Sequence, residues 1–169
     1  FAGALNKAVR SLELKATGLH WPAMGELTDE LLRRHLSQAT DLRLFAIAEA
    51  YRRGWSTADI HKETEINPWF LEQMKGLIDL EGNLLCYTWG TLPNELLTEA
   101  KQKNFSDRHL AHLFHVTEEE IRARREQAGI KPVYKQVDSC AGEFEALTPY
   151  YYSTWHGLDE AETSTKKKV

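Results

Sequence analysis

Apolar residues recur at helical spacing along most of the chain. In residues 1–14, Leu5, Val9 and Leu12 fall on one face of a helix. Comparable patterns predict helices over about 27–37, 41–53, 67–82, 93–103, 106–114 and 117–129, with a short one starting at Ser56. We therefore expect an all-α fold of seven or eight helices.

Residues suited to helix ends support these boundaries. The N-cap candidates are Thr28, Ser56, Asn67, Ser106 and Thr117, and Asp59 would form an imperfect capping box with Ser56. Gly54, Gly82 and Gly129 are expected to end helices. The side chains expected to face inward from the helix over 67–82 are Phe70, Met74, Leu77 and Ile78. Residues 41–53 are apolar on most sides, which is typical of a central helix surrounded by others. Residues 15–26 are expected to form a loop.

The chain also contains an internal repeat. Two segments align without gaps when residues fifty positions apart are compared, so that Ser56 pairs with Ser106 and Ile60 with Leu110. Helix caps match caps, and apolar positions match apolar positions. This pattern predicts two similar three-helix units, 43–78 and 93–128.

Residues 132–155 break the helical pattern and predict an extended C-terminal arm. Prolines at both ends and many β-branched and aromatic residues favour two extended pieces, about 132–138 and 148–155. In the second piece Tyr150 and Tyr152 should share one face, with Tyr151 on the other. These rings either close the domain's own core or contact a neighbour. If they contact a neighbour, at least one ring should be partly exposed.

Composition narrows the function classes. The 169 residues are 42% hydrophobic and 27% charged, which is typical of a single globular domain. A net charge of −4 argues against a general nucleic-acid or membrane-surface binder. Two cysteines are too few for a disulfide framework, and no apolar run reaches the length of a membrane span.

Three constellations invite a chemical interpretation, and each has a structural alternative that we favour. The first is formed by His109, His112 and His115, which are possible metal ligands spaced three residues apart. No cysteine or carboxylate cluster completes a metal site with them. Segment 106–125 resembles a helix-turn-helix. Its second helix would present three glutamates, 118–120, to DNA phosphates, which would repel them.

The third constellation is a pair of carboxylates, Glu143 and Glu145. They could act as a general acid–base pair. No nucleophile or basic residue is placed with them, so contacts to backbone or to arginines across a domain boundary are the preferred interpretation. We therefore predict no catalytic, cofactor-binding or metal-binding residue in this segment. DNA binding through the helix-turn-helix is kept as the alternative function.

Several stretches resemble one enzyme family. Residues 137–146 read Val-Asp-Ser-Cys-Ala-Gly-Glu-Phe-Glu-Ala, and 148–154 read Thr-Pro-Tyr-Tyr-Tyr-Ser-Thr. Residues 1–13, 69–71 and 105–107 add shorter matches. Together they resemble the large subunit of carbamoyl-phosphate synthase, in the helical oligomerization domain between its two ATP-grasp synthetase units.

The resemblance implies a role and a setting. Residues 1–14 would belong with the preceding synthetase unit, 15–155 would form the oligomerization domain, and 156–169 would be a linker to the next domain. The whole enzyme, a glutamine-hydrolysing ligase, makes carbamoyl phosphate from bicarbonate, glutamine-derived ammonia and ATP for arginine and pyrimidine biosynthesis. ATP, Mg or Mn ions and K ions would bind the synthetase units. A glutaminase subunit or domain is an implied partner, and the implied location is the cytoplasm.

Two surfaces are candidates for contacts. Leu27 and Leu31 lie on a different line of their helix from Leu32 and Leu36, so one line should meet the central helix and the other a second copy. Alternatively, the loop at 15–26 covers the second line through Leu19 and Trp21. The candidate self-association residues are Leu31, Leu32, His35 and Leu36. The candidate interdomain contacts are Glu143, Phe144, Tyr150, Tyr151, Tyr152 and Trp155.

Overall fold

The structure is a computed structural model of the chain, and it describes residues 1–12, 14, 16–144 and 150–161. The chain divides into two compact units, Phe1–Arg122 and Ala123–Val169. The described helices are α1 (Ala2–Ser11), α2 (Pro22–Gly25), α3 (Asp29–Ser37), α4 (Arg43–Arg52), α5 (Thr57–Thr64), α6 (Pro68–Leu85), α7 (Asn94–Gln102), α8 (Asp107–Phe114) and α9 (Glu118–Gln127). The strands are β1 (Val133–Gln136) and β2 (Tyr151–Thr154).

The all-α prediction is confirmed, with one more helix in the described residues than expected. The additional helix is α2, a single turn that begins at Pro22 inside the segment predicted as a loop. Proline suits the first helical position, because its missing N–H would have no partner there. None of the helices in the described part of the chain combines the length and apolar character that a membrane span requires.

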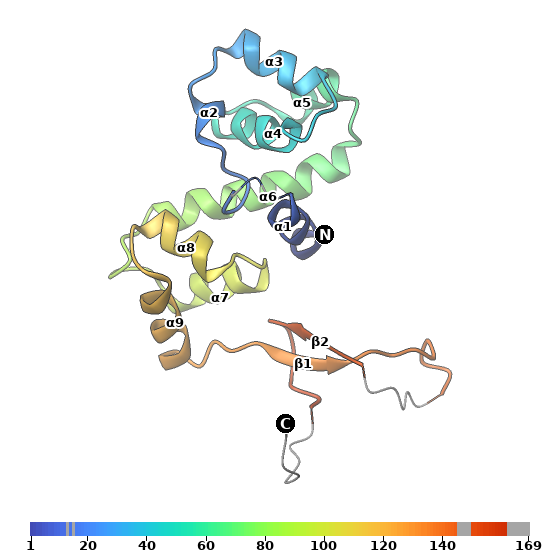
Figure 1. Cartoon of the computed structure of the whole chain (residues 1–169), viewed down its shortest axis with the longest axis vertical. Coiled ribbons are helices and arrows are strands. Elements are labelled where there is room, and N and C mark those ends of the chain that lie inside the picture. The colour runs from blue at the N-terminus through green and yellow to red at the C-terminus, as the bar shows by residue number, and fades with distance from the viewer. Residues whose placement is uncertain (13, 15, 145–149, 162–169) are drawn as a thin grey trace. The chain divides into compact units, whose positions relative to one another are not determined.

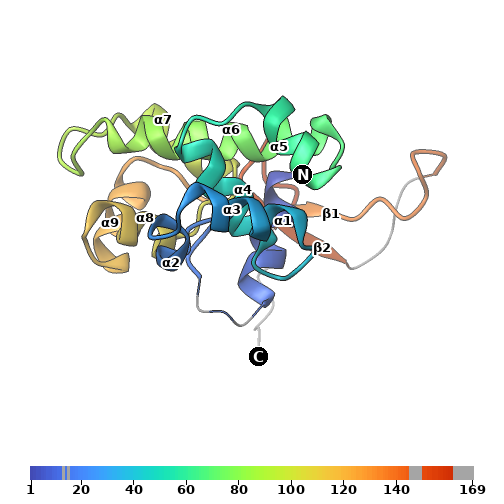
Figure 2. The same ribbon diagram turned by 90° about the horizontal axis from the view of Figure 1, so that it is seen from above.

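The first unit is built around α4 and α6. Helices α3 and α5 group with α4 in both views of the chain (Figures 1 and 2). In Figure 1, α6 lies between this group and the pair α7 and α8. The expectation that residues 41–53 form the central helix is confirmed, because Phe45, Ile47 and Ala48 have no exposed surface. Helix α1 packs against α6 within the same unit.

The helix caps occur where the sequence predicted them. Thr28 accepts a hydrogen bond from the N–H of Leu31, and Asn67 accepts one from Trp69. The imperfect capping box expected at Ser56 is complete, since Ser56 and Asp59 each bond the other's backbone N–H. These local bonds satisfy N–H groups that a helix start otherwise leaves without partners.

The predicted repeat is visible in the backbone. Helix α8 begins fifty positions after α5 begins and ends fifty positions after α5 ends, and each helix is eight residues long. Each is followed by a residue in the left-handed region, Glu65 at φ 58° and His115 at φ 55°. Ile60 and Leu110 occupy equivalent positions and are both fully buried. The superposition of the two complete units in three dimensions stays a prediction.

Two expectations about α6 were wrong. The helix does not end at Gly82 but continues to Leu85, because Leu84 is buried and that burial outweighs the cost of about 1 kcal/mol for a glycine inside a helix. Phe70 does not face inward, because 47% of its surface is exposed.

The second unit contains an antiparallel hairpin. Strands β1 and β2 pair with Val133 opposite Thr154 and Gln136 opposite Tyr151. The two extended pieces predicted for the arm are therefore confirmed in the described residues, whereas residues 148 and 149 of the second piece lie outside them. At the base of the hairpin, the guanidinium of Arg125 lies 5.4 Å from the ring centroid of Trp155, which ties the end of α9 to the end of β2.

Candidate interaction site

Helix α3 separates its leucines into a buried line and an exposed line. Leu32 and Leu36 have no exposed surface and pack into the core, whereas Leu31 is 42% exposed and His35 is half-buried. Of the four candidate self-association residues, only Leu31 and His35 can therefore reach a partner. Leu32 and Leu36 form the row of leucines on α3 that was expected to face the central helix.

The loop before α2 packs Leu19 and Trp21 into the first unit. Leu19 is buried, and Trp21 lies with its ring centroid 5.5 Å from that of Phe45 on α4. This loop therefore covers the central helix. The apolar side chain of Leu31 stays open to solvent at the surface of the unit.

An ion pair attaches the start of α3 to the end of α4. Arg53, just after α4, donates to Asp29 of α3 at 2.8 Å and to Glu49 of its own helix at 2.9 Å. Hydrogen bonds to Asp29 and Glu49 raise the pKa of Arg53 above its already high ordinary value. The charged N-terminal turn of α3 is thus attached to the C-terminal end of α4, which holds Leu31 in one position.

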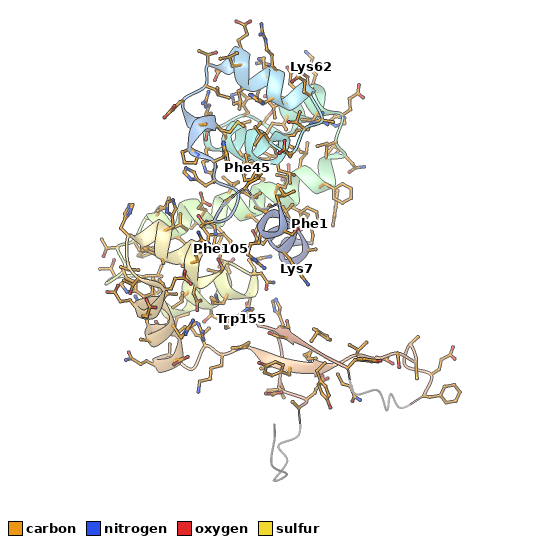
Figure 3. All side chains as sticks on the ribbon, in the orientation of Figure 1. Phe1, Lys7, Phe45, Lys62, Phe105 and Trp155 are labelled. Carbon is orange, nitrogen blue, oxygen red and sulfur yellow. The ribbon has the colours of Figure 1, made fainter. Side chains whose placement is uncertain are left out.

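Three aromatic side chains gather where α1 meets the start of α6. The ring centroid of Phe1 lies 5.7 Å from that of Trp69 and 5.8 Å from that of Phe70, and the rings of Trp69 and Phe70 are 5.0 Å apart. Figure 3 labels Phe1 at this junction. Trp69 is 55% exposed. We call these three residues the aromatic cluster.

The aromatic cluster is a surface that the sequence reasoning missed. Residues 69–71 were recognised as a match to the family, but Phe70 was assigned to the core because it lies near the apolar stripe of α6. Leu71 and Met74 are buried, whereas Trp69 and Phe70, in the first turn of α6, stay exposed. A signal was present, since adjacent helical residues point about 100° apart, so Trp69 and Phe70 cannot both lie at the centre of one narrow apolar stripe.

A buried polar cluster connects three helices of the first unit. Glu81 on α6 accepts hydrogen bonds from Arg52 on α4 at 3.2 and 2.7 Å. Its other oxygen lies 3.4 Å from Nε2 of His109 on α8, whose ring stacks on Phe105 at 4.7 Å. This distance is at the long end for a hydrogen bond, so Nε2 has no well-formed partner among the described residues.

The polar cluster has a structural role in the first unit. Burial alone would raise the pKa of Glu81, but the close approach of the His109 ring, together with the charge and hydrogen bonds of Arg52, outweighs burial and lowers the pKa below its ordinary value. Arg52 also donates to the backbone carbonyl of Leu19 at 3.1 Å. The ionised carboxylate therefore holds α4, α6, α8 and the loop before α2 together.

The three histidines of α8 point to different surroundings. His109 is buried beside Glu81, His112 lies with its ring centroid 5.9 Å from that of His20, and His115 ends the helix. Within the described ranges, no group of three or more His, Cys, Asp and Glu side chains is arranged to hold a metal ion.

The arm exposes most of its aromatic rings. Tyr150, Tyr151 and Tyr152 are 67%, 48% and 50% exposed, and Trp155 is half-buried. The expectation that at least one of these rings remains partly exposed is confirmed. Glu143 and Phe144 are also exposed, whereas Glu145 lies outside the described residues.

Comparisons with known proteins identify relatives. Residues 1–129 match the family described as "Carbamoyl-phosphate synthetase large chain, oligomerisation domain". The chain is 42% identical over 174 residues to the carbamoyl phosphate synthase large chain of Archaeoglobus fulgidus, covering all of this chain and 16% of that protein. It is 43% identical over 170 residues to the large chain of Thermotoga neapolitana, covering all of this chain and 15% of that one.

A third relative carries a more specific name. The carbamoyl phosphate synthase arginine-specific large chain of Bacillus subtilis is 43% identical over 165 residues, which cover 98% of this chain and 16% of that protein. The chain thus spans about a sixth of the length of the relatives it matches.

Proposed function

Because the chain belongs to the family of carbamoyl-phosphate synthetase large-chain oligomerisation domains, we propose that it is a non-catalytic connecting domain. It holds two neighbouring ATP-grasp synthetase units of one large chain together and contributes to self-association. The relatives extend well beyond the matched segment, which supports the presence of such neighbours in the parent chain.

The aromatic cluster is the observation that carries this proposal. Phe1, Trp69 and Phe70 hold one another in edge-to-face and tilted contacts and still expose large apolar areas. A contiguous exposed apolar patch on a folded domain is typical of an interaction site. Aromatic residues of this kind contribute strongly to interfaces, because they bury much area while losing little side-chain entropy.

The chemistry of the whole protein belongs to the neighbouring units in this proposal. There, bicarbonate, glutamine-derived ammonia and ATP would be converted to carbamoyl phosphate, with Mg or Mn ions and K ions bound in those units. A glutaminase subunit or domain would supply the ammonia. The product would serve arginine or pyrimidine biosynthesis in the cytoplasm, and one relative is named arginine-specific.

Self-association is proposed to use α3. Leu31 remains exposed beside the half-buried His35, and the ion pair between Arg53 and Asp29 attaches the helix to the end of α4. Two copies of α3 related by a two-fold axis would bury both Leu31 side chains at once, the simplest closed arrangement.

The test of the connecting role uses the full large chain and two matched variants. Trp69 and Leu85 lie near opposite ends of α6, and each is 55% exposed. We expect Trp69→Arg to separate the unfolding of this domain from that of its neighbours, seen as an additional calorimetric transition and faster release by limited proteolysis. Leu85→Arg should leave both measurements unchanged.

The same pair of variants can contradict the proposal. If Trp69→Arg and Leu85→Arg unfold and digest alike, and both like the unsubstituted protein, then the aromatic cluster does not connect domains. Far-ultraviolet circular dichroism of the isolated segment checks that each variant is folded. Leu85→Arg should change the stability of the segment by no more than about 0.5 kcal/mol. Trp69→Arg removes two ring contacts worth about 0.5–1.5 kcal/mol each and should leave the segment folded.

A further inference from the structure

Along β2, the backbone N–H and C=O groups of successive residues point alternately toward β1 and away from it. The N–H of Val137, just after β1, donates to the carbonyl of Tyr150 at 2.8 Å. Opposed residues of an antiparallel ladder alternate between hydrogen-bonded and non-hydrogen-bonded pairs. Counting from Tyr150, the backbone groups of Tyr151 and Ser153 therefore point away from β1, toward the outer edge of β2.

The outer edge of β1 is covered by the chain itself. The N–H of Glu160 donates to the carbonyl of Tyr134 at 2.8 Å, and the carboxylate of Asp159 accepts from the N–H of Tyr134 at 3.3 Å. The carboxylate of Glu160 accepts from the N–H of Gln136 at 3.0 Å and pairs with Lys135 at 2.9 Å. This edge therefore has its donors satisfied and carries charge.

The outer edge of β2 has none of these protections. Within the part of the chain that the structure describes, no hydrogen bond from outside the hairpin reaches the backbone of Tyr151 or Ser153. Residues 150–155 contain no charged residue and no proline. Folded proteins normally guard an exposed edge with such residues, because an open edge recruits another strand. The contrast with β1 marks the β2 edge as a docking position.

We propose that the β2 edge accepts an extended strand from a neighbouring domain of the same large chain. The inference rests on the proposed connecting function and gives it a specific contact. The backbone of Tyr151 and Ser153 would pair with that strand, and Tyr151 and Tyr152 would pack against its side chains from opposite faces. The strand should carry β-branched or aromatic residues and no proline where it meets this edge.

Two arguments favour a neighbouring domain over a second copy of the chain. A two-stranded hairpin gains stability from an added strand, and a strand of the same polypeptide supplies that strand in every molecule, not only in assembled ones. A strand in the same polypeptide is present at an effective concentration of order millimolar, which a free second copy does not reach. The relatives are about six times longer than this chain, which leaves room for the neighbouring domain that would supply such a strand.

Amide hydrogen exchange resolved to single residues tests the docking. The amides of Tyr151 and Ser153 should exchange at least about tenfold more slowly in the full large chain than in the isolated segment, since they gain hydrogen bonds. The amide of Tyr152, which points toward β1, is the internal reference and should change much less.

A proline substitution provides the matched test. Ser153→Pro removes the outward N–H while deleting no hydrogen bond inside the hairpin, whereas Ser153→Ala keeps that N–H. In the full large chain, Ser153→Pro should return Tyr151 to fast exchange, and Ser153→Ala should not. Slow exchange of Tyr152 in the isolated Ser153→Pro variant shows that the hairpin is intact.

Two results would overturn the inference. Equal exchange of Tyr151 and Ser153 in the segment and in the full chain would mean that no strand docks at this edge. Protection that appears in the isolated segment and grows with its concentration would assign the edge to a second copy. If either result occurs while Trp69→Arg still uncouples the domains, only the β2 contact fails and the connecting function stands.

Discussion

Lys101 donates a hydrogen bond from its ammonium to the carboxylate of Asp107 at 2.6 Å, and the lysine is almost completely buried. Fifty positions earlier, the hydroxyls of Tyr51 and Thr57 lie 3.1 Å apart. The two copies of the repeat therefore have a side-chain contact at equivalent positions between their first and second helices. This contact is neutral in the first copy and ionic in the second.

This correspondence predicts a compensated exchange. Lys101→Met should destabilise the first unit by about 3–5 kcal/mol, because it leaves the carboxylate of Asp107 without its buried partner. The double variant Lys101→Tyr with Asp107→Thr copies the first repeat and should recover most of that loss. Urea unfolding measures both. A double variant no more stable than the single one would show that the two sites are not equivalent.

Glu81 should make stability depend on pH. Its pKa is lowered in the folded state from an ordinary value of 4.5, so its contribution is present above that value and is lost as pH falls through the folded pKa. As pH falls from 7 into the acid range, the free energy of unfolding of Glu81→Gln should therefore decrease less than that of the unsubstituted protein. The control Glu95→Gln, at an exposed position of α7, should keep the full acid dependence in urea titrations.

Gly18 is required by its contact with the histidine of the polar cluster. A Cβ at this position would lie 2.4 Å from Cε1 of His109, and the residue has φ +114°. Gly54 also has a positive φ, +81°, but a Cβ there meets open space. Gly54→Ala should cost about 1 kcal/mol and Gly18→Ala clearly more, as compared by thermal unfolding.

The two lines of α3 predict opposite effects for adjacent leucines. Leu32→Ala removes a fully buried side chain and should cost about 2–5 kcal/mol, whereas Leu31→Ala should have little effect on folding. Leu31→Glu should instead weaken self-association in analytical ultracentrifugation while the circular dichroism spectrum is unchanged.

Gln38→Glu is the control for Leu31→Glu, because it adds the same charge at an exposed position just after α3. If Leu31→Glu sediments like Gln38→Glu and like the unsubstituted chain, α3 is not the self-association surface. A chain that remains monomeric at high concentration without any substitution would contradict the assignment equally.

Features that depend on nearby residues could be predicted from the sequence. The caps at Thr28, Ser56 and Asn67 follow from side chains that reach N–H groups two or three positions away. The central helix follows from apolar residues on nearly all of its sides. These interactions do not require knowledge of the partner helix.

Features that depend on distant residues could not be predicted. Glu81 was placed at the end of a helix because Gly82 was taken as its stop, and its partners Arg52 and His109 are far away in the sequence. Likewise, the hydrogen bonds of Asp159 and Glu160 to the edge of β1 join residues about 25 positions apart in the sequence. Register and edge pairing are set by tertiary contacts that a composition pattern does not contain.

The most direct measurement of the connecting role is hydroxyl-radical footprinting of the isolated segment and of the full large chain. Trp69 and Phe70 should be oxidised readily in the segment and several-fold more slowly in the full chain, with Leu85 on the same helix as the reference. Equal oxidation of Trp69 and Phe70 in both proteins would contradict the account, because the aromatic cluster would then remain open to solvent beside its neighbours.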